Sequence, residues 1–154
     1  MIETPITDDE ILFRRILANK GLYETLPDGR VLFSSQAFAD RTFRPSVDRA
    51  SLCDNSPKHS LGPYSDKEAG VTSLITGDVR GIIEHEREGL IQTFFVDVEH
   101  KPIEKDPDQP DSSENFAHAE IYTTPPCTKG VFKKLRERLA LLANASQWAL
   151  KPSE

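Results

Sequence analysis

Four residues in two apolar segments have side chains suited to metal binding or acid–base catalysis. Asp97 and Glu99 belong to LIQTFFVDVEH, and His118 and Glu120 belong to NFAHAEI. Both segments have the alternation of β-strands, in which residues two apart share a face. Pairing of Glu99 with His118 and of Asp97 with Glu120 would place three carboxylates and an imidazole together. Such a cluster suits a divalent cation or proton transfer.

The register of these two strands decides whether the cluster exists. A shift of one residue would send Asp97 and Glu99 to the face opposite His118 and Glu120. The interpretation that we favour is a solvated sheet face with a cross-strand Glu–His pair. A deaminase-type zinc site is one thiol short, because the position three residues after Cys127 is a glycine. We therefore expect no metal and no cofactor.

Arginines and hydroxyl groups are concentrated in residues 30–52, RVLFSSQAFADRTFRPSVDRASL. These groups are the usual partners of phosphate and carboxylate. Asp40 and Asp48 lie in the same segment, and ion pairs with them are the simpler explanation. The residues that could bind a ligand are Arg30, Ser35, Arg41, Arg44 and Arg49. The sequence has no glycine-rich phosphate loop, no G-x-S-x-G and no H-E-x-x-H.

Composition is that of a globular protein with one domain over residues 1–150 and a tail over 151–154. The chain has 154 residues and a net charge of −6, which disfavours non-specific nucleic-acid binding. The two cysteines are far apart and fit a reducing compartment. The sequence has no signal-peptide pattern and no apolar run of about 20 residues, the length that spans a membrane. We expect a cytoplasmic protein.

The hydrophobic pattern predicts an α+β fold. We expect a mixed or mainly antiparallel sheet of about five to six strands covered by two or three helices, with the C-terminal helix packed on the sheet. Helices are predicted over 6–21, from the capping-box spacing of Thr7 and Glu10, and over 76–89 and 128–150. ILFRRIL within the first of these also fits a strand. Strands are predicted over 21–25, 30–38, 45–52, 70–76, 90–100 and 116–123.

Two long proline-rich segments, 54–70 and 101–115, are predicted to be loops. Loops of this length in a small domain are either functional or mobile. We interpret both as mobile surface loops.

Two resemblances add to this interpretation. The fragments SSQAF…SVDRA and NFAHAEI resemble segments of uncharacterised bacterial proteins of this size, and no activity follows from that likeness. The chain also resembles ADP-ribosyltransferase folds, which carry an Arg or His on an early strand, a Ser motif on a second strand and a Glu on a late strand. Arg14 or Arg15, Ser35 and Glu120 follow that order, which implies a site that uses NAD.

The function that we expect is that of a small non-enzymatic interaction or accessory protein. It would belong to a bacterial multi-gene system of defence or toxin–immunity type, with a protein partner and with a homodimer left open. Two enzyme alternatives also stay open, namely a metal or acid–base site at Asp97, Glu99, His118 and Glu120, or an ADP-ribosyltransferase-like site. A nucleic-acid reader built on residues 30–49 is the least favoured hypothesis because of the negative charge.

Overall fold

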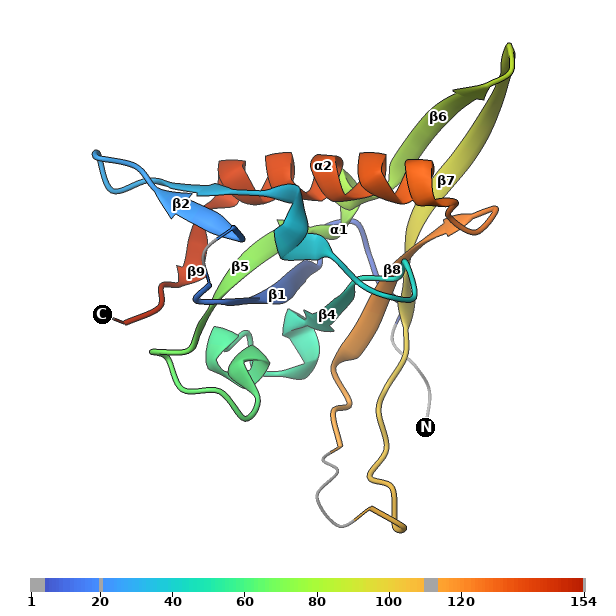
Figure 1. Cartoon of the computed structure of the whole chain (residues 1–154). Helices are drawn as coiled ribbons and strands as arrows, with labels where there is room; N and C mark the ends of the chain where they lie inside the picture. The colour runs from blue at the N-terminus through green and yellow to red at the C-terminus, as the bar shows by residue number, and fades with distance from the viewer. Residues whose placement is uncertain (1–4, 20, 110–113, 154) are drawn as a thin grey trace.

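The chain folds around a seven-stranded antiparallel sheet (Figure 1). The structure is a computed structural model that describes residues 5–19, 21–109 and 114–153. The strand order is β6-β7-β8-β4-β1-β5-β9, and β2 and β3 form a separate hairpin. The strands are β1 Ile11–Leu17, β2 Tyr23–Thr25, β3 Val31–Phe33, β4 Ser46–Arg49, β5 Ala69–Ile75, β6 Gly81–Arg87, β7 Leu90–His100, β8 His118–Thr124 and β9 Trp148–Leu150. The predicted α+β class is confirmed, whereas the predicted strand number is too low.

Helix α2, Lys129–Ser146, lies across one face of the sheet (Figure 1). The Thr128 side chain caps it by accepting a hydrogen bond from the Val131 N–H, as the sequence suggests. The fully buried side chains of Val131, Leu135 and Leu139 form its apolar stripe. The prediction that the C-terminal helix packs on the sheet is therefore confirmed.

The end of α2 was predicted too late. Gln147 adopts a left-handed conformation, with φ of 66°, and the chain then continues as β9. The Gln147 amide forms hydrogen bonds with both the N–H and the carbonyl of Val31, at 2.7 and 3.0 Å. Trp148 packs edge-on against Tyr23 and Phe33. Contacts with the distant β2–β3 hairpin therefore end the helix.

The helix predicted over residues 6–21 is wrong, because Ile11–Leu17 is strand β1 at the centre of the sheet. It pairs with β5 over its whole length and with β4 at one end. A strand that is buried on both faces has apolar side chains at neighbouring positions and not only at every second one. Such a run of apolar residues also fits the spacing expected of a helix. Glu10 binds Arg49 and does not act as a capping-box residue.

The helix predicted over residues 76–89 is also wrong. Only α1, Thr76–Val79, is helical, and the chain continues as β6. A tight turn at Glu88 and Gly89, both with positive φ, joins β6 to β7. Among the described residues, α2 is the one long helix that covers the sheet, so the predicted number of two or three covering helices is wrong.

The two faces of the sheet are covered differently. The main core lies between the sheet, α2, the β2–β3 hairpin and a 3₁₀ helix, Ser35–Phe38. On the opposite face, the segment with the 3₁₀ helices Ala50–Leu52 and Pro57–Leu61 covers β1 and β5 around Phe13 and Val71. The face of β4, β8 and β7 on that side carries mainly polar side chains.

The two predicted loops are partly regular. Pro57–Leu61 is helical, and β5 begins at Ala69 within the range predicted for the first loop. In the second, a bridge between Ile103 and Asn115 extends the β7–β8 ladder. Residues 110–113 of that loop and Glu154 of the predicted tail lie outside the described residues. In the described part of the chain, no helix combines the length and apolar character needed to cross a membrane.

Candidate functional site

The four residues considered as a metal or acid–base cluster do share one face of the sheet, but in another register. Strands β7 and β8 pair with Glu99 opposite Glu120 and Asp97 opposite Tyr122. This register differs by two residues from the predicted one, and a shift of two keeps each side chain on its face. Asp97, Glu99, His118 and Glu120 therefore all lie on the face opposite α2.

Arg44 bridges the two glutamates. Its guanidinium donates to Glu120 Oε1 at 2.7 Å and to Glu99, and it lies over the Tyr122 ring at 4.8 Å. Burial lowers the pKa of Arg44, but the hydrogen bonds and charges of Glu120 and Glu99 outweigh burial and raise it. Arg44 was predicted to bind a ligand, and here it neutralises two neighbouring carboxylates within the chain.

Asp97 has its own cationic partner, Arg80, which sequence reasoning did not identify. Arg80 Nε donates to Asp97 Oδ1 at 2.8 Å, and its NH1 donates to Asp8 at 2.7 Å. Hydrogen bonds to Asp97 and Asp8 raise the pKa of Arg80. Within the described ranges, no group of three or more His, Cys, Asp or Glu side chains is placed to hold a metal ion. The polar face is an ion-pair network.

His118 is oriented from both sides. Its Nδ1 lies 2.7 Å from the Lys101 carbonyl oxygen, which can only accept, so Nδ1 carries a proton. Its Nε2 lies 3.1 Å from Ser46 Oγ and accepts the hydroxyl proton when the imidazole is neutral. A hydroxyl bonded to an imidazole that a third group orients has the geometry of an activated nucleophile. Ser46 is one of the hydroxyl residues of segment 30–52, but its pairing with His118 was not predicted, because the two residues lie 72 positions apart.

A groove of about 880 Å³ lies beside this pair, between the sheet and the two predicted loops. We call it the histidine groove, and its lining includes Ser46, Asp48, His59, Ser60, Asn115 and His118. Asp48 accepts hydrogen bonds from Ser60 Oγ at 2.6 Å and Asn115 Nδ2 at 2.8 Å. Asn115 Oδ1 lies 2.9 Å from His59 Nε2. Asp48 therefore ties both loops to β4, and the prediction that it neutralises an arginine is wrong.

The predicted binding residues of segment 30–52 do not lie together at one site. Arg49 is fully buried, and two of its nitrogens donate to the Glu10 carboxylate at 2.7 and 2.9 Å. Ser35 begins a 3₁₀ helix on the α2 side of the sheet, and Arg30 lies in the β2–β3 turn. Arg41 is exposed in the turn that precedes β4. Only Arg44 reaches the polar face.

The ADP-ribosyltransferase-like set is also divided between the two faces. Arg14 lies on the α2 side and donates to the carbonyls of Ala37 and Ser46, and burial lowers its pKa to about 10. Arg15 lies on the other face over the Tyr64 ring, at 4.8 Å. Ser35 and Glu120 lie on opposite sides of the sheet, so the three predicted groups do not form one site.

Comparison of the chain with protein families, with curated proteins and with solved structures gave no match. The resemblance of SSQAF…SVDRA and NFAHAEI to bacterial segments stays a prediction. The function is therefore inferred from the geometry of the chain itself.

Proposed function

We propose that this protein is a non-enzymatic protein-binding module that docks through the paired strands β6 and β7. We call residues 82–95 the arm, because this hairpin extends beyond the rest of the sheet (Figure 1). The observation that carries the proposal is its exposed apolar surface. Four large side chains of the arm are at least half exposed: Ile82 at 53%, Phe95 at 56%, Ile91 at 66% and Leu90 at 76%. A cluster of this kind is typical of an interaction site.

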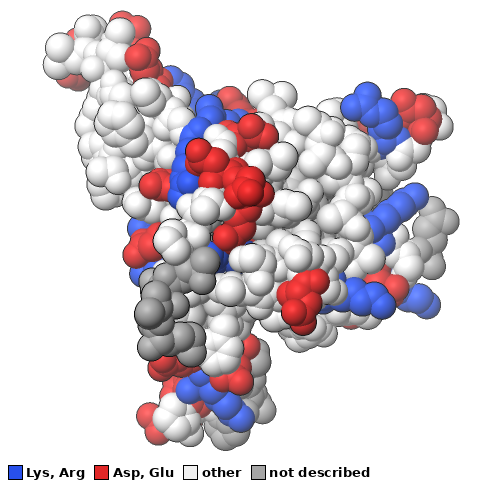
Figure 2. Space-filling view, turned by 180° about the vertical axis from the view of Figure 1, so that it is seen from behind, with Lys and Arg blue, Asp and Glu red and all other residues white. Residues whose placement is uncertain are grey.

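Three of these side chains project from one face of the arm. The register places Ile82 opposite Phe95 and Glu86 opposite Ile91. Residues opposite each other share a face, so Ile82, Ile91 and Phe95 lie on the same side together with Glu84 and Glu86. Seen from behind, the arm carries a broad uncharged area, with acidic groups near its tip (Figure 2). The arm therefore offers a mixed apolar and acidic surface.

This mixture defines the partner. Apolar groups bordered by carboxylates are complementary to a protein surface whose apolar side chains are bordered by lysine or arginine. A second copy of this chain fits less well, because Glu84 and Glu86 would meet the same carboxylates, and the chain carries a net charge of −6. The proposed occupant is therefore a different protein with a basic and apolar patch.

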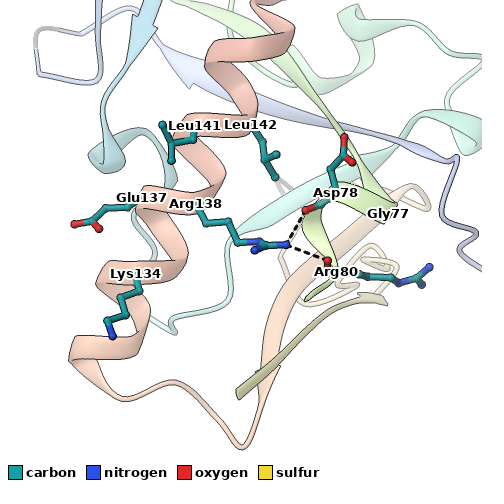
Figure 3. Close-up of a pocket in the computed structure, with 8 residues that line it drawn as sticks. All are labelled: Gly77, Asp78, Arg80, Lys134, Glu137, Arg138, Leu141 and Leu142. Atoms are coloured by element: carbon teal, nitrogen blue, oxygen red, sulfur yellow. Dashed lines mark hydrogen bonds between the residues drawn. The ribbon is translucent and has the colours of Figure 1, made fainter. Parts of the chain in front are cut away.

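Docking on the face of the arm, and not along its edge, follows from the surroundings of β6. This strand is at the edge of the sheet, but Lys134 Nζ donates to the Glu84 carbonyl at 2.8 Å. Nearby, Arg138 donates to the carbonyls of Asp78 and Arg80, at 3.0 Å each (Figure 3). Basic side chains over an edge strand hinder the addition of another strand. A partner would therefore bind to the exposed side chains on the face of the arm and not to the backbone of β6.

The polar face supports a non-enzymatic role, because the carboxylates proposed for catalysis are neutralised by Arg44 and Arg80. The bacterial defence or toxin–immunity setting stays a prediction. If that setting is correct, the docking partner is encoded by a neighbouring gene, so the products of neighbouring genes are the first proteins to test for binding.

Site-specific photo-crosslinking in the native cell tests the docking surface. A crosslinker in place of Ile91 should capture one defined protein, whereas one in place of Leu141, exposed on α2, should not. With that protein purified, Ile91→Asp and Phe95→Ser should each weaken binding by about tenfold or more, as central interface residues do. Leu141→Asp is the matched control. Equal capture at both positions, or arm variants that bind like the wild type, would contradict the proposal.

Acyl transfer at Ser46 is a second candidate function, favoured by the Ser46–His118 hydrogen bond. Ser46 Oγ would attack an ester carbonyl carbon while His118 Nε2 takes the hydroxyl proton and passes it to the departing alcohol. Water, activated by the same imidazole, would then release the acid from the serine ester. A fluorophosphonate probe should label Ser46 in the wild type and in Ser60→Ala but not in His118→Gln. Lack of labelling in the wild type would remove this candidate.

A further inference from the structure

The turn before β4 and the first half of α2 border a second pocket, which is shallow and open to solvent and has a volume of about 540 Å³. We call it the aromatic pocket, and its lining includes Asp40, Arg41, Phe43, Lys129, Phe132 and Arg136. It shares no lining residue with the histidine groove or with the arm. Because the pocket is open, a ligand in it would keep part of its surface in contact with solvent.

Two stacked rings form the apolar part of the pocket. The Phe43 and Phe132 centroids are 4.8 Å apart, with 26° between the ring planes. Phe132 is buried on α2, whereas Phe43 is only half-buried, so part of the Phe43 ring stays accessible. A planar group in the pocket can therefore extend the stack.

Phe43 is held in place by its turn. Its φ is 62°, in the left-handed region that non-glycine residues rarely adopt. The Phe43 N–H donates to the Asp40 carbonyl at 3.1 Å, and Asp40 Oδ1 accepts from both the N–H and the hydroxyl of Thr42. Strained residues that their surroundings fix in this way are concentrated at ligand sites. The ring is thus positioned before any ligand arrives.

The pocket carries an excess of positive charge. It is lined by three cations, Arg41, Lys129 and Arg136, and by one carboxylate, Asp40. None of the ion pairs found over the described residues involves any of these three cations. The Arg136 guanidinium lies 5.2 Å from the Phe132 ring centroid, and its buried Nε has no hydrogen-bond partner in the protein. Arg41 and Lys129 are both exposed and are therefore available to an anionic ligand.

We propose that the aromatic pocket binds a small anion that carries a planar ring, with a mononucleotide as the ligand class. The base stacks on Phe43, and the phosphate is bound by Arg41 and Lys129, with Arg136 at the border between them. Arginine binds phosphate in a bidentate manner and also stacks on planar groups, which suits both parts of such a ligand. This site is independent of the arm, so it would add small-molecule binding to protein docking.

Calorimetry with adenosine monophosphate, together with amide chemical-shift mapping, tests the pocket. Shifts should be confined to residues 39–43 and 128–136. Adenosine and inorganic phosphate should each bind at least about tenfold more weakly than the nucleotide, because each makes only half of the contacts. Added salt should weaken the binding, since the cations are exposed to solvent.

Variants separate the two parts of the site. Arg41→Gln combined with Lys129→Gln should weaken binding by about tenfold or more, and Phe43→Leu should remove the difference between nucleotide and phosphate. Arg30→Gln, which removes an exposed arginine far from the pocket, should have no effect. No shift in either segment at millimolar nucleotide, equal affinity for adenosine, or binding of a single-stranded oligonucleotide alone would each overturn the proposal.

Discussion

At the scale of single residues, Arg49 is the clearest structural determinant. It was predicted to bind a ligand, yet its side chain is 0% exposed and donates twice to Glu10. Removing one member of such a buried pair leaves the other charged and desolvated, at a cost of about 3–5 kcal/mol. The pair therefore joins the start of β1 to the end of β4, and each partner depends on the other.

Glu10→Gln should lower the free energy of unfolding by about 3 kcal/mol, because Arg49 is left buried without its counter-charge. Urea denaturation measures the change, and Glu24→Gln in the exposed β2 strand is the matched control. The double variant Glu10→Leu with Arg49→Met should recover much of the loss. A loss no greater than that of the control would show that the pair is not required.

Cys53 gives a pH-dependent prediction. Burial, with a smaller effect from the charge of Asp48, raises the pKa of its thiol from 9.0 to about 11. Below pH 9 the thiol is neutral in both the folded and the unfolded chain, so ionisation has no effect on stability. Between about pH 9 and 11 only the unfolded chain ionises readily, and stability falls as the pH rises.

Wild-type protein should therefore lose on the order of 2 kcal/mol more stability than Cys53→Ala between these limits. Urea denaturation midpoints of both proteins at pH 8.5 and pH 11 measure this difference. The other titrating groups are the same in both proteins, so their effects cancel when the two losses are compared. Parallel losses in the two proteins would contradict a buried thiol with a raised pKa.

At the scale of elements, β1 and β6 were both predicted to be helical, β1 because its apolar residues fit more than one period and β6 because Thr76 and Gly89 resemble the start and end of a helix. In β1 these residues face two cores, one on each side of the sheet. In β6 the decisive signal was the Glu88–Gly89 turn, which closes a hairpin with β7. Helix α2 was predicted correctly because its stripe faces a single core, and Thr128 marks its start.

Strand β9 and the residues around it pack so closely against β5 that one added methyl group at Gly70 would disturb them. A Cβ at Gly70 would lie 2.6 Å from the Pro152 ring, 2.7 Å from Trp148 and 2.8 Å from the Leu150 carbonyl. Gly70→Ala should therefore displace β9 and cost about 1–3 kcal/mol, with faster amide exchange at residues 148–150. Ser73→Ala on the same strand is the control and should cost little. Unchanged exchange at β9 would contradict the predicted displacement.

At the scale of the whole molecule, the sheet is supported unevenly. Strands β1 and β5 lie between α2 on one face and the segment 50–64 on the other, while the tip of the arm, residues 86–92, projects away from both cores (Figure 1). Regions with few buried apolar contacts open with the smallest free energy. The arm can thus adjust its shape to a partner without unfolding the centre.

Hydrogen exchange should follow this pattern. Amides of β1, β5 and β8 should exchange slowest, at rates set by global unfolding, and those of residues 86–92 should exchange much faster. Addition of the docking partner should slow exchange in the arm alone. Protection of residues 86–92 equal to that of β1 in the free protein would contradict the prediction.

The sequence by itself determined the α+β class, helix α2 with its Thr128 cap, the two strands that form the β2–β3 hairpin, and strands β7 and β8. It also determined that Asp97 and Glu99 share a face, as do His118 and Glu120. These features depend on local dihedral angles, turn residues and the two-residue repeat of a strand, all of which nearby residues specify.

Only the tertiary structure decided which of these groups meet. Arg44 lies 55 residues from Glu99 and 76 from Glu120, Ser46 lies 72 from His118, and the aromatic pocket joins residues 39–43 to α2. The register between strands that are distant in sequence depends on packing against both faces of the sheet. It cannot be predicted from the pattern of neighbouring residues alone. For this reason the sequence left open whether the four acidic and histidine residues form a catalytic cluster, and the structure shows that Arg44 and Arg80 pair with the three carboxylates. The sites proposed for docking and for ligand binding lie elsewhere.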